Sequence, residues 1–417
     1  MEMPRLNEIL NGKINLQNLL VNTPLLDVNL LLANQLGVNS AIVRELFKLE
    51  IKERFINPTT DNPVRIQDFL KHLSLSRITP TLKKMYEEDY RFKYPPGAVL
   101  KTMIYFKLKR RFLSEVFIDL TTDPELVENL GFCMIPDYKQ LYHFLDYRLG
   151  GDGTKILSDA FVIAIREEFA KLNVAFGERL VIDATPLAAK ATDRDAQYNG
   201  HYKIKGYLWH NLRNLDTGIP IAFHVTNANE DEGTFLAPLL MKARQLGIKF
   251  REVYFDGGYA SLENIMRVEE FFGAKVYCNI TDNWKIRKDG FSEEIKKQYM
   301  KLWMEPFWKP KVSFEYMKYA LMLVDKAKNV GAYHRNRTIA EYAECPDGYL
   351  EAYYLRNRIE GNHGTEKRQT EIKNFNGKGI DKFTAHVGLH VITLQAVALC
   401  RLQNGVSEGL INLGGIT

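Results

Sequence analysis

The chain has 417 residues, a length that suits two or three domains better than one simple core. Apolar residues make up 46% of it and charged residues 26%, an ordinary globular balance that excludes disordered, collagen-like and coiled-coil chains. No run approaches about 18 apolar residues, and the N-terminus lacks a basic segment followed by an apolar one. We therefore expect neither a membrane span nor a signal peptide.

The cysteines indicate a reducing compartment. There are four, they lie far apart, and none forms a C-x-x-C pair: Cys133, Cys278, Cys345 and Cys400. This spacing argues against a zinc knuckle and more strongly against a disulfide framework. We expect a cytoplasmic protein.

Positive charge is concentrated in two blocks rather than spread over the chain. Residues 51–111 hold fourteen Lys or Arg against six Asp or Glu, and residues 281–340 hold thirteen against seven, whereas residues 112–150 hold two against seven. Two basic blocks favour a polyanion that is contacted at more than one place. The alternative, two solvated helical surfaces, remains open on charge alone.

The first part of the chain is predicted to be all helical. Apolar residues recur at helical spacing before residue 75, and Pro95-Pro96-Gly97 starts a second helical stretch. Asp123-Pro124 starts another helix, and Ser158 to Leu172 forms the last one before the pattern changes. Four basic side chains crowd the second helical stretch: Lys107, Lys109, Arg110 and Arg111.

From about residue 176 the pattern predicts a mixed sheet covered by helices. The predicted order is a strand, a hairpin about Asp216-Thr217-Gly218, a helix, a strand, a helix and a strand: 179–185, 201–227, 234–246, 252–256, 261–272 and 275–280. A basic, tryptophan-containing insert follows at about 283–345. Helices resume near Tyr349, and Ala385 to Leu402 is predicted to be a buried terminal helix. This second domain spans 176–405 and leaves a short tail, 406–417.

Two aspartates follow the apolar residues of predicted strands. Asp183 follows Leu-Val-Ile, and Asp256 follows Val-Tyr-Phe and precedes two glycines. Carboxylates at the ends of neighbouring strands repel each other unless a cation lies between them, and Mg²⁺ prefers such oxygen ligands. The alternative is that each aspartate only caps the next helix or turn. By the same reasoning, Asp231 and Glu232 are expected to cap the helix near Thr234, with a supporting role at the metal as the alternative.

Four polar side chains lie on one face of a single predicted helix: Tyr353, Arg356, Glu360 and Lys367. At 100° per residue they fall within about 60° of one another. A chance ion pair at i, i+4 explains Arg356 and Glu360 but not the other two. Phosphodiester chemistry uses this set, because a carboxylate holds a metal, a guanidinium grips phosphate as a fork and an ammonium adds a point charge.

These motifs resemble those of a large branch of prokaryotic insertion-sequence transposases. The pattern Y-x-x-R-x-x-x-E-x-x-x-x-x-x-K runs from Tyr353 to Lys367 with every spacing met. VIDATP and YFDGGYAS are similar to the two aspartate motifs of that branch, and KIKGYLWHNLRNLDTGIPIAFHVTNANEDE resembles the hairpin between them. The resemblance covers roughly residues 95–402.

The resemblance implies an α/β, ribonuclease H-like catalytic domain, preceded by an all-α region and interrupted by an insert. Asp183, Asp256 and Glu360 would be the catalytic residues and would hold two ions of Mg²⁺ or Mn²⁺, of which one activates the attacking oxygen and the other stabilises the leaving oxygen. Tyr353, Arg356 and Lys367 would contact transposon-end DNA. Residues 1–175 would also bind the DNA ends, through a helix-turn-helix-like arrangement in which Lys107, Lys109, Arg110 and Arg111 contact phosphates. The resemblance implies two partners: double-stranded DNA, as transposon ends and as target, and a second copy of the chain in the synaptic complex. It also implies a cytoplasmic protein that associates with the nucleoid.

Some features depart from the resemblance. Gly361 and Gly364 lie inside the predicted helix, and the insert is short, so the route of second-strand cleavage stays open. Three of the four tryptophans lie in the insert, where they either pack in a core or stack on a displaced base: Trp284, Trp303 and Trp308. Lys205 and His210 on the hairpin are candidates to face DNA, with one of them expected to face solvent.

Three other functions share features with this sequence. A haloacid-dehalogenase-like phosphotransferase wants a second aspartate two residues after the first, where this chain has Thr185. A catalytically silent, transposase-derived DNA-binding protein would not need the intact Asp183, Asp256 and Glu360. A general nuclease of the same fold would not bind one specific inverted repeat. The sequence therefore favours a transposase that cleaves at element ends and joins 3′ ends to target DNA.

Overall fold

The computed structural model describes residues 63–86, 93–110, 112–279, 338, 341, 346–357, 372, 375 and 377–417. The first 62 residues, Arg111, nearly all of the predicted insert with its three tryptophans, and the pair Glu360 and Lys367 lie outside the described residues.

The described N-terminal part is helical, as predicted. Its elements are α5 (Ile66–Lys71), α6 (Thr79–Lys84), α7 (Pro96–Lys109), α8 (Leu113–Thr122), α9 (Pro124–Leu130), α10 (Tyr138–His143), the π-helical turn η1 (Phe144–Leu149) and α11 (Gly150–Lys171). The stretch that begins at Pro95 is two helices rather than one. Arg110 adopts a left-handed conformation with φ of 57°, which an α-helix does not accommodate, so α7 ends there and α8 begins in a new direction.

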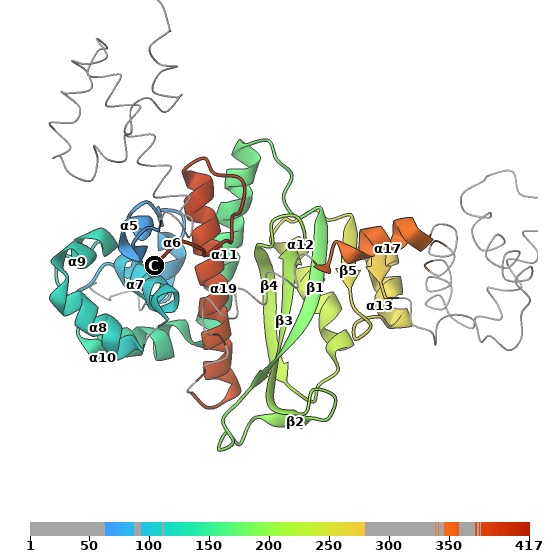
Figure 1. The fold of residues 1–417 in the computed structure, drawn as a ribbon, viewed down its shortest axis with the longest axis horizontal. Helices are drawn as coiled ribbons and strands as arrows, with labels where there is room; N and C mark the ends of the chain where they lie inside the picture. The colour runs from blue at the N-terminus through green and yellow to red at the C-terminus, as the bar shows by residue number, and fades with distance from the viewer. Residues whose placement is uncertain are drawn as a thin grey trace, which may run out of the picture.

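The second part forms the mixed sheet that the sequence predicts (Figure 1). Its strands are β1 (Arg179–Ala188), β2 (Gln197–Asn199), β3 (Ile204–Asn214), β4 (Pro220–Asn227), β5 (Glu252–Phe255) and β6 (Lys275–Cys278). β1 lies between β3, to which it is antiparallel, and β5, to which it is parallel; β6 follows at the edge. The predicted hairpin is β3–β4, and β2, which the sequence did not predict, pairs with β3 beyond the end of β4.

Helices cover this sheet. The elements after β4 are the 3₁₀ turn η2 (Glu232–Phe235), α12 (Leu236–Gln245), α13 (Leu262–Met266), the π-helical turn η3 (Arg267–Phe271), α17 (Pro346–Tyr354) and α19 (Ile380–Gln403). The terminal helix α19 packs against both α11 and β4, and α17 packs beside β6 (Figure 1). Val387 and Val391 of α19 lie in one buried cluster with Trp209 and Phe223 of the sheet. The fold is therefore the expected ribonuclease H-like α/β arrangement, preceded by helices.

The helical part and the sheet share one core. Buried residues from α5, α7, α11, α19 and β1 belong to a single cluster, and the C-terminal tail joins it through Leu410, Leu413 and Ile416. The tail also pairs with the start of the described chain, because Val64 N donates to the Gly415 carbonyl at 2.7 Å. The tail thus packs within the molecule and does not extend from it.

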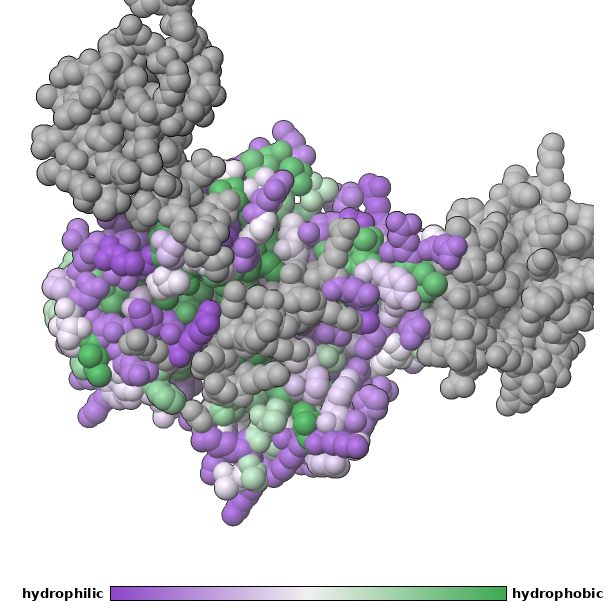
Figure 2. Space-filling view, in the orientation of Figure 1, coloured by the Kyte–Doolittle hydropathy of each residue, from purple (hydrophilic) through white to green (hydrophobic). Residues whose placement is uncertain are grey.

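α19 is long and apolar enough to cross a membrane by those two criteria, but 94% of its apolar window is buried inside the protein. Its composition is explained by its place between α11 and the sheet, where both sides of the helix meet apolar side chains. On the face of the molecule seen in Figure 2, hydrophilic and hydrophobic residues of the described part are interspersed. The buried position of α19 is that of a core helix.

Candidate active site

The two aspartates follow the paired stretch of the adjacent parallel strands β1 and β5. These strands pair in register from Arg179 opposite Glu252 to Val181 opposite Tyr254, and Asp183 and Asp256 each stand two residues beyond the last pair. Both carboxylates act on the same buried group, since the charge of each raises the pKa of Tyr259. One expectation was wrong: Asp183 does not end its strand, because β1 continues to Ala188 along β3. What ends at this point is the parallel pairing with β5, so the gap between the strands opens beside the carboxylates.

Asp256 begins a tight turn. Its Oδ1 accepts a hydrogen bond from Gly258 N at 3.1 Å, and its carbonyl accepts from Tyr259 N. Asp256 does not cap the next helix, because Ser261 is the residue that caps α13. One carboxylate oxygen of Asp256 is therefore engaged by the turn.

Arg356 lies beside Asp183. Its Nη1 is 3.9 Å from Asp183 Oδ1, and the two side chains are 13% and 21% exposed. The guanidinium also lies over the ring of Tyr353, 5.4 Å from its centroid, and Tyr353 is buried in the core. Leu355 packs against the cluster of Val181 and Tyr254. Thus Arg356 is held at the aspartates, while Tyr353 supports it from below instead of facing outward.

The helix predicted to run through this segment is not continuous. α17 ends at Tyr354, and the amides of Leu355 and Arg356 bond to carbonyls three residues back, as in a turn. A single helical wheel therefore does not apply from Tyr353 onward, because a turn breaks the rotation of 100° per residue. Glu360 and Lys367, which the same wheel placed beside Arg356, lie outside the described residues.

A third carboxylate reaches the site from η2. Asp231 caps η2 as expected, with its side chain accepting from Gly233 N. Glu232 does not cap: its Oε1 accepts a hydrogen bond from Tyr202 OH at 2.7 Å. Tyr202 belongs to the turn between β2 and β3, which the sequence did not predict. The only signal in the sequence is that Tyr202 stands at the start of the predicted hairpin segment, 201–227.

Behind the carboxylates lies a buried hydrogen-bond chain. Thr226 Oγ1 donates to the Asn227 carbonyl, so it accepts from His210 Nε2 at 3.0 Å, and His210 Nδ1 then accepts from Tyr259 OH at 2.7 Å. His210 is fully buried, and burial lowers its pKa to about 3, which keeps the ring neutral. The prediction that His210 faces DNA is wrong, and Lys205 donates to the carbonyls of Ala191 and Asp193.

The charges of three carboxylates, Asp183, Asp256 and Glu232, act on the same two tyrosines, Tyr259 and Tyr202. Burial raises the pKa of Tyr259, and the charges of Glu232, Asp183 and Asp256 raise it further. The pKa of Tyr202 is also raised, by burial and then by its bond to Glu232 and the neighbouring carboxylates. Burial raises the pKa of Glu232, and repulsion from Asp256 adds to this while the bond from Tyr202 opposes it. Negative charge is thus concentrated around the turn of Asp256.

The donor set suits a hard divalent cation. Asp183, Asp256 and Glu232 supply only oxygen atoms, which Mg²⁺ and Mn²⁺ prefer. Among the described residues, no group of three or more His, Cys, Asp or Glu has the geometry of a metal site. The two aspartates therefore fit as part of a cation site whose completion needs another ligand, and Glu360 remains the candidate for it.

The four basic residues predicted to contact phosphate do not form one surface. Lys107 is only 4% exposed, and its Nζ donates to His386 Nδ1 at 2.9 Å, so this ammonium faces inward. Lys109 is half-buried with its ammonium over the ring of Tyr105, and Arg110 is exposed. Arg111 lies outside the described residues. The basic surface of α7 is thus carried by Lys109 and Arg110.

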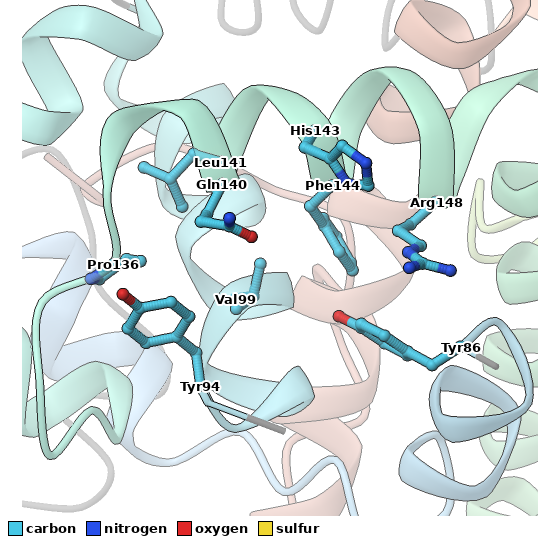
Figure 3. Close-up of a pocket in the computed structure, with 9 residues that line it drawn as sticks. All are labelled: Tyr86, Tyr94, Val99, Pro136, Gln140, Leu141, His143, Phe144 and Arg148. Carbon is cyan, nitrogen blue, oxygen red and sulfur yellow. The ribbon is translucent and has the colours of Figure 1, made fainter. Parts of the chain in front are cut away.

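A small cavity lies among the N-terminal helices, between α7 and the α10–η1 segment (Figure 3). Tyr86, Tyr94, Phe144 and Arg148 line it, and the Arg148 guanidinium lies 5.1 Å from the centroid of the Tyr86 ring. Its volume of about 30 Å³ has room for about one water molecule. The cavity is therefore a packing feature, too small for a nucleotide base.

A comparison with models of protein families gives a match to this chain. Residues 175–395, from just before β1 to the middle of α19, match the family described as "Transposase DDE domain". A search of curated proteins finds no match. The matched range contains both strand aspartates, Glu232 and the segment of Tyr353 and Arg356.

Proposed function

The chain belongs to the transposase DDE domain family, whose members use divalent metal ions, and we propose that it cuts DNA at the ends of an insertion sequence and joins the 3′ ends to target DNA. The observation that supports this proposal is that Asp183 and Asp256 each stand two residues beyond the last pair of β1 and β5, with Arg356 beside Asp183. Carboxylates can hold a cation, and a guanidinium beside them can bind the phosphate of a phosphodiester.

In this proposal Asp183, Asp256 and Glu360 hold divalent ions, which supply activation of the attacking oxygen and stabilisation of the leaving oxygen. Arg356 binds the phosphate, because its guanidinium already lies beside Asp183 and over the ring of Tyr353. Lys367 adds charge to the same phosphate. Tyr353 holds Arg356 in place from the core, which differs from the direct DNA contact expected of it.

The N-terminal helices are proposed to bind the terminal inverted repeats. Lys109 and Arg110, with Arg111 next to them in the sequence, are proposed to contact phosphates, and such contacts fix the register of a protein on DNA. The exposure of Arg110 supports this. A second copy of the chain is proposed to bind the other end, so that a homodimer holds both ends for joining.

The test is an assay of the full chain with a duplex that carries the inverted repeat of its own element and Mg²⁺. The proposal expects cleavage at the element boundary, joining of the 3′ end to a second duplex, and loss of both with Asp256→Asn. Cleavage that ignores the repeat would identify a general nuclease. Specific binding without cleavage would identify a silent DNA-binding descendant.

A further inference from the structure

We propose that Glu232 is a further carboxylate of this active centre and that, held by Tyr202, it strengthens divalent cation binding on the Asp256 side. This inference deepens the proposed function and rests on it.

Glu232 and Asp256 converge on one point, the α-carbon of Gly258. A β-carbon at position 258 would lie 2.5 Å from Glu232 Oε2 and 3.3 Å from Asp256 Oδ1. Real β-carbons do not come within about 3 Å of another atom, so a side chain at position 258 would displace the flexible end of Glu232. Glycine at this position therefore lets Glu232 keep its present approach to Asp256.

The orientation of Glu232 is fixed rather than free. Oε1 accepts from Tyr202 OH, which leaves Oε2 as the oxygen that faces Gly258. The turn that presents Tyr202 is itself built for this, since Asn199 Oδ1 accepts from the amides of both His201 and Tyr202. From the other side, Asn264 donates to the carbonyls of Gly233 and Tyr259, which ties the Glu232 segment to the Asp256 turn.

The charged form of Glu232 is disfavoured where it lies, and a bound cation would offset this. Glu232 is partly buried, and repulsion from Asp256 adds to the cost of burying its charge. Within the described part of the chain, no Lys or Arg forms an ion pair with Glu232 or Asp256; Arg356 is paired with Asp183 instead. Carboxylates that are held together against their repulsion mark a functional site more often than a structural one.

Glu232 is therefore assigned as a positioning residue for the cation, acting directly or through a water on the ion bound at Asp256. Carboxylates that support a metal site in this way change metal affinity by about 10- to 100-fold when they are removed. If Glu232 had only a structural role, Glu232→Gln would destabilise the metal-free protein. A role at the cation predicts no such destabilisation.

The experiment has two measurements on the full chain without DNA. Isothermal titration calorimetry measures Mn²⁺ binding, and thermal melting in EDTA measures the stability of the metal-free protein. Glu232→Gln keeps the shape and can still accept from Tyr202. It should weaken Mn²⁺ binding about 10-fold and should raise or leave unchanged the melting temperature in EDTA, because it relieves repulsion. Tyr202→Phe should weaken Mn²⁺ binding less, and Gly258→Ala should weaken it without removing any charge.

Glu230→Gln is the matched control, since Glu230 is an exposed carboxylate of the same segment, and its Mn²⁺ binding should equal that of the wild type. The inference is overturned if Glu232→Gln binds Mn²⁺ like the wild type while Asp256→Asn binds weakly. If Asp183→Asn and Asp256→Asn also bind like the wild type, the proposed metal site itself fails, whatever Glu232 does.

Discussion

The guanidinium of Arg356 lies 3.9 Å from the carboxylate of Asp183, so under the proposed function it would compete with the cation for this aspartate. This competition would weaken cation binding in the DNA-free protein. A phosphate that draws Arg356 away would remove the competition. DNA and metal should therefore strengthen each other's binding, because coupling between two sites is reciprocal.

Removal of this charge gives the first prediction. Arg356→Gln should raise the Mn²⁺ affinity of the DNA-free protein by about threefold to tenfold, since opposite charges near a protein surface contribute about 1 kcal/mol. The same variant should bind end DNA more weakly. Arg356→Lys should change Mn²⁺ binding little, and Arg251→Gln, at an exposed arginine, serves as the control. An Arg356→Gln variant with unchanged or weaker Mn²⁺ binding would contradict this competition.

The second prediction concerns the chemistry. Asp183→Asn, Asp256→Asn and Glu360→Gln should each lower cleavage and joining by at least about 1,000-fold, because each removes a charged metal ligand. Binding of end DNA should stay within a few-fold of the wild type, as measured by gel shift. Asp152→Asn removes an exposed carboxylate of α11 and should leave cleavage unchanged. Near wild-type cleavage by Glu360→Gln in Mg²⁺ would show that the third ligand is another residue.

The third prediction separates exposed from buried basic residues of α7. Lys109→Gln combined with Arg110→Gln should flatten the slope of log K against log salt for DNA binding by about 2, one for each lost phosphate contact. Lys107→Met should leave that slope unchanged. Instead it should destabilise the protein by about 1–3 kcal/mol, because His386 Nδ1 loses its buried donor.

Two measurements check this contrast, salt titration of DNA binding and chemical denaturation. If Lys107→Met flattens the slope of log K against log salt as much as the double variant does, then Lys107 contacts DNA and this prediction is wrong.

The fourth prediction follows from His210. Burial lowers its pKa to about 3 in the folded protein, whereas the unfolded chain has the ordinary value near 6.5. Between these values the unfolded state binds a proton that the folded state does not, so stability falls as the pH falls through this window. The contribution reaches about 1.4 kcal/mol per pH unit.

Denaturant unfolding between pH 7 and pH 4 should therefore show a shallower pH dependence for His210→Gln than for the wild type. His201→Gln, at an exposed histidine of the neighbouring turn, should keep the wild-type slope. Equal slopes for His210→Gln and the wild type would mean that His210 is protonated in the folded protein.

The sequence by itself determined the class of fold and the two aspartates. The change from helical to alternating periodicity near residue 176, the turn at Asp216-Thr217-Gly218 and the apolar runs before Asp183 and Asp256 are local signals. Local backbone and burial preferences act over a few residues, so elements of this kind can be predicted without any tertiary contact. The spacing from Tyr353 to Lys367 likewise pointed to the family.

Only the tertiary structure decided how the side chains of distant segments meet. Periodicity showed that Lys107 lies on a helix, but its burial depends on His386, which packs against it from α19. The same holds for His210, whose partners Tyr259 and Thr226 come from other segments. Glu232 looked like a cap in the sequence. It faces Asp256 because the β2–β3 turn supplies Tyr202 and the Asp-Gly-Gly turn leaves space, and no local pattern encodes such long-range contacts.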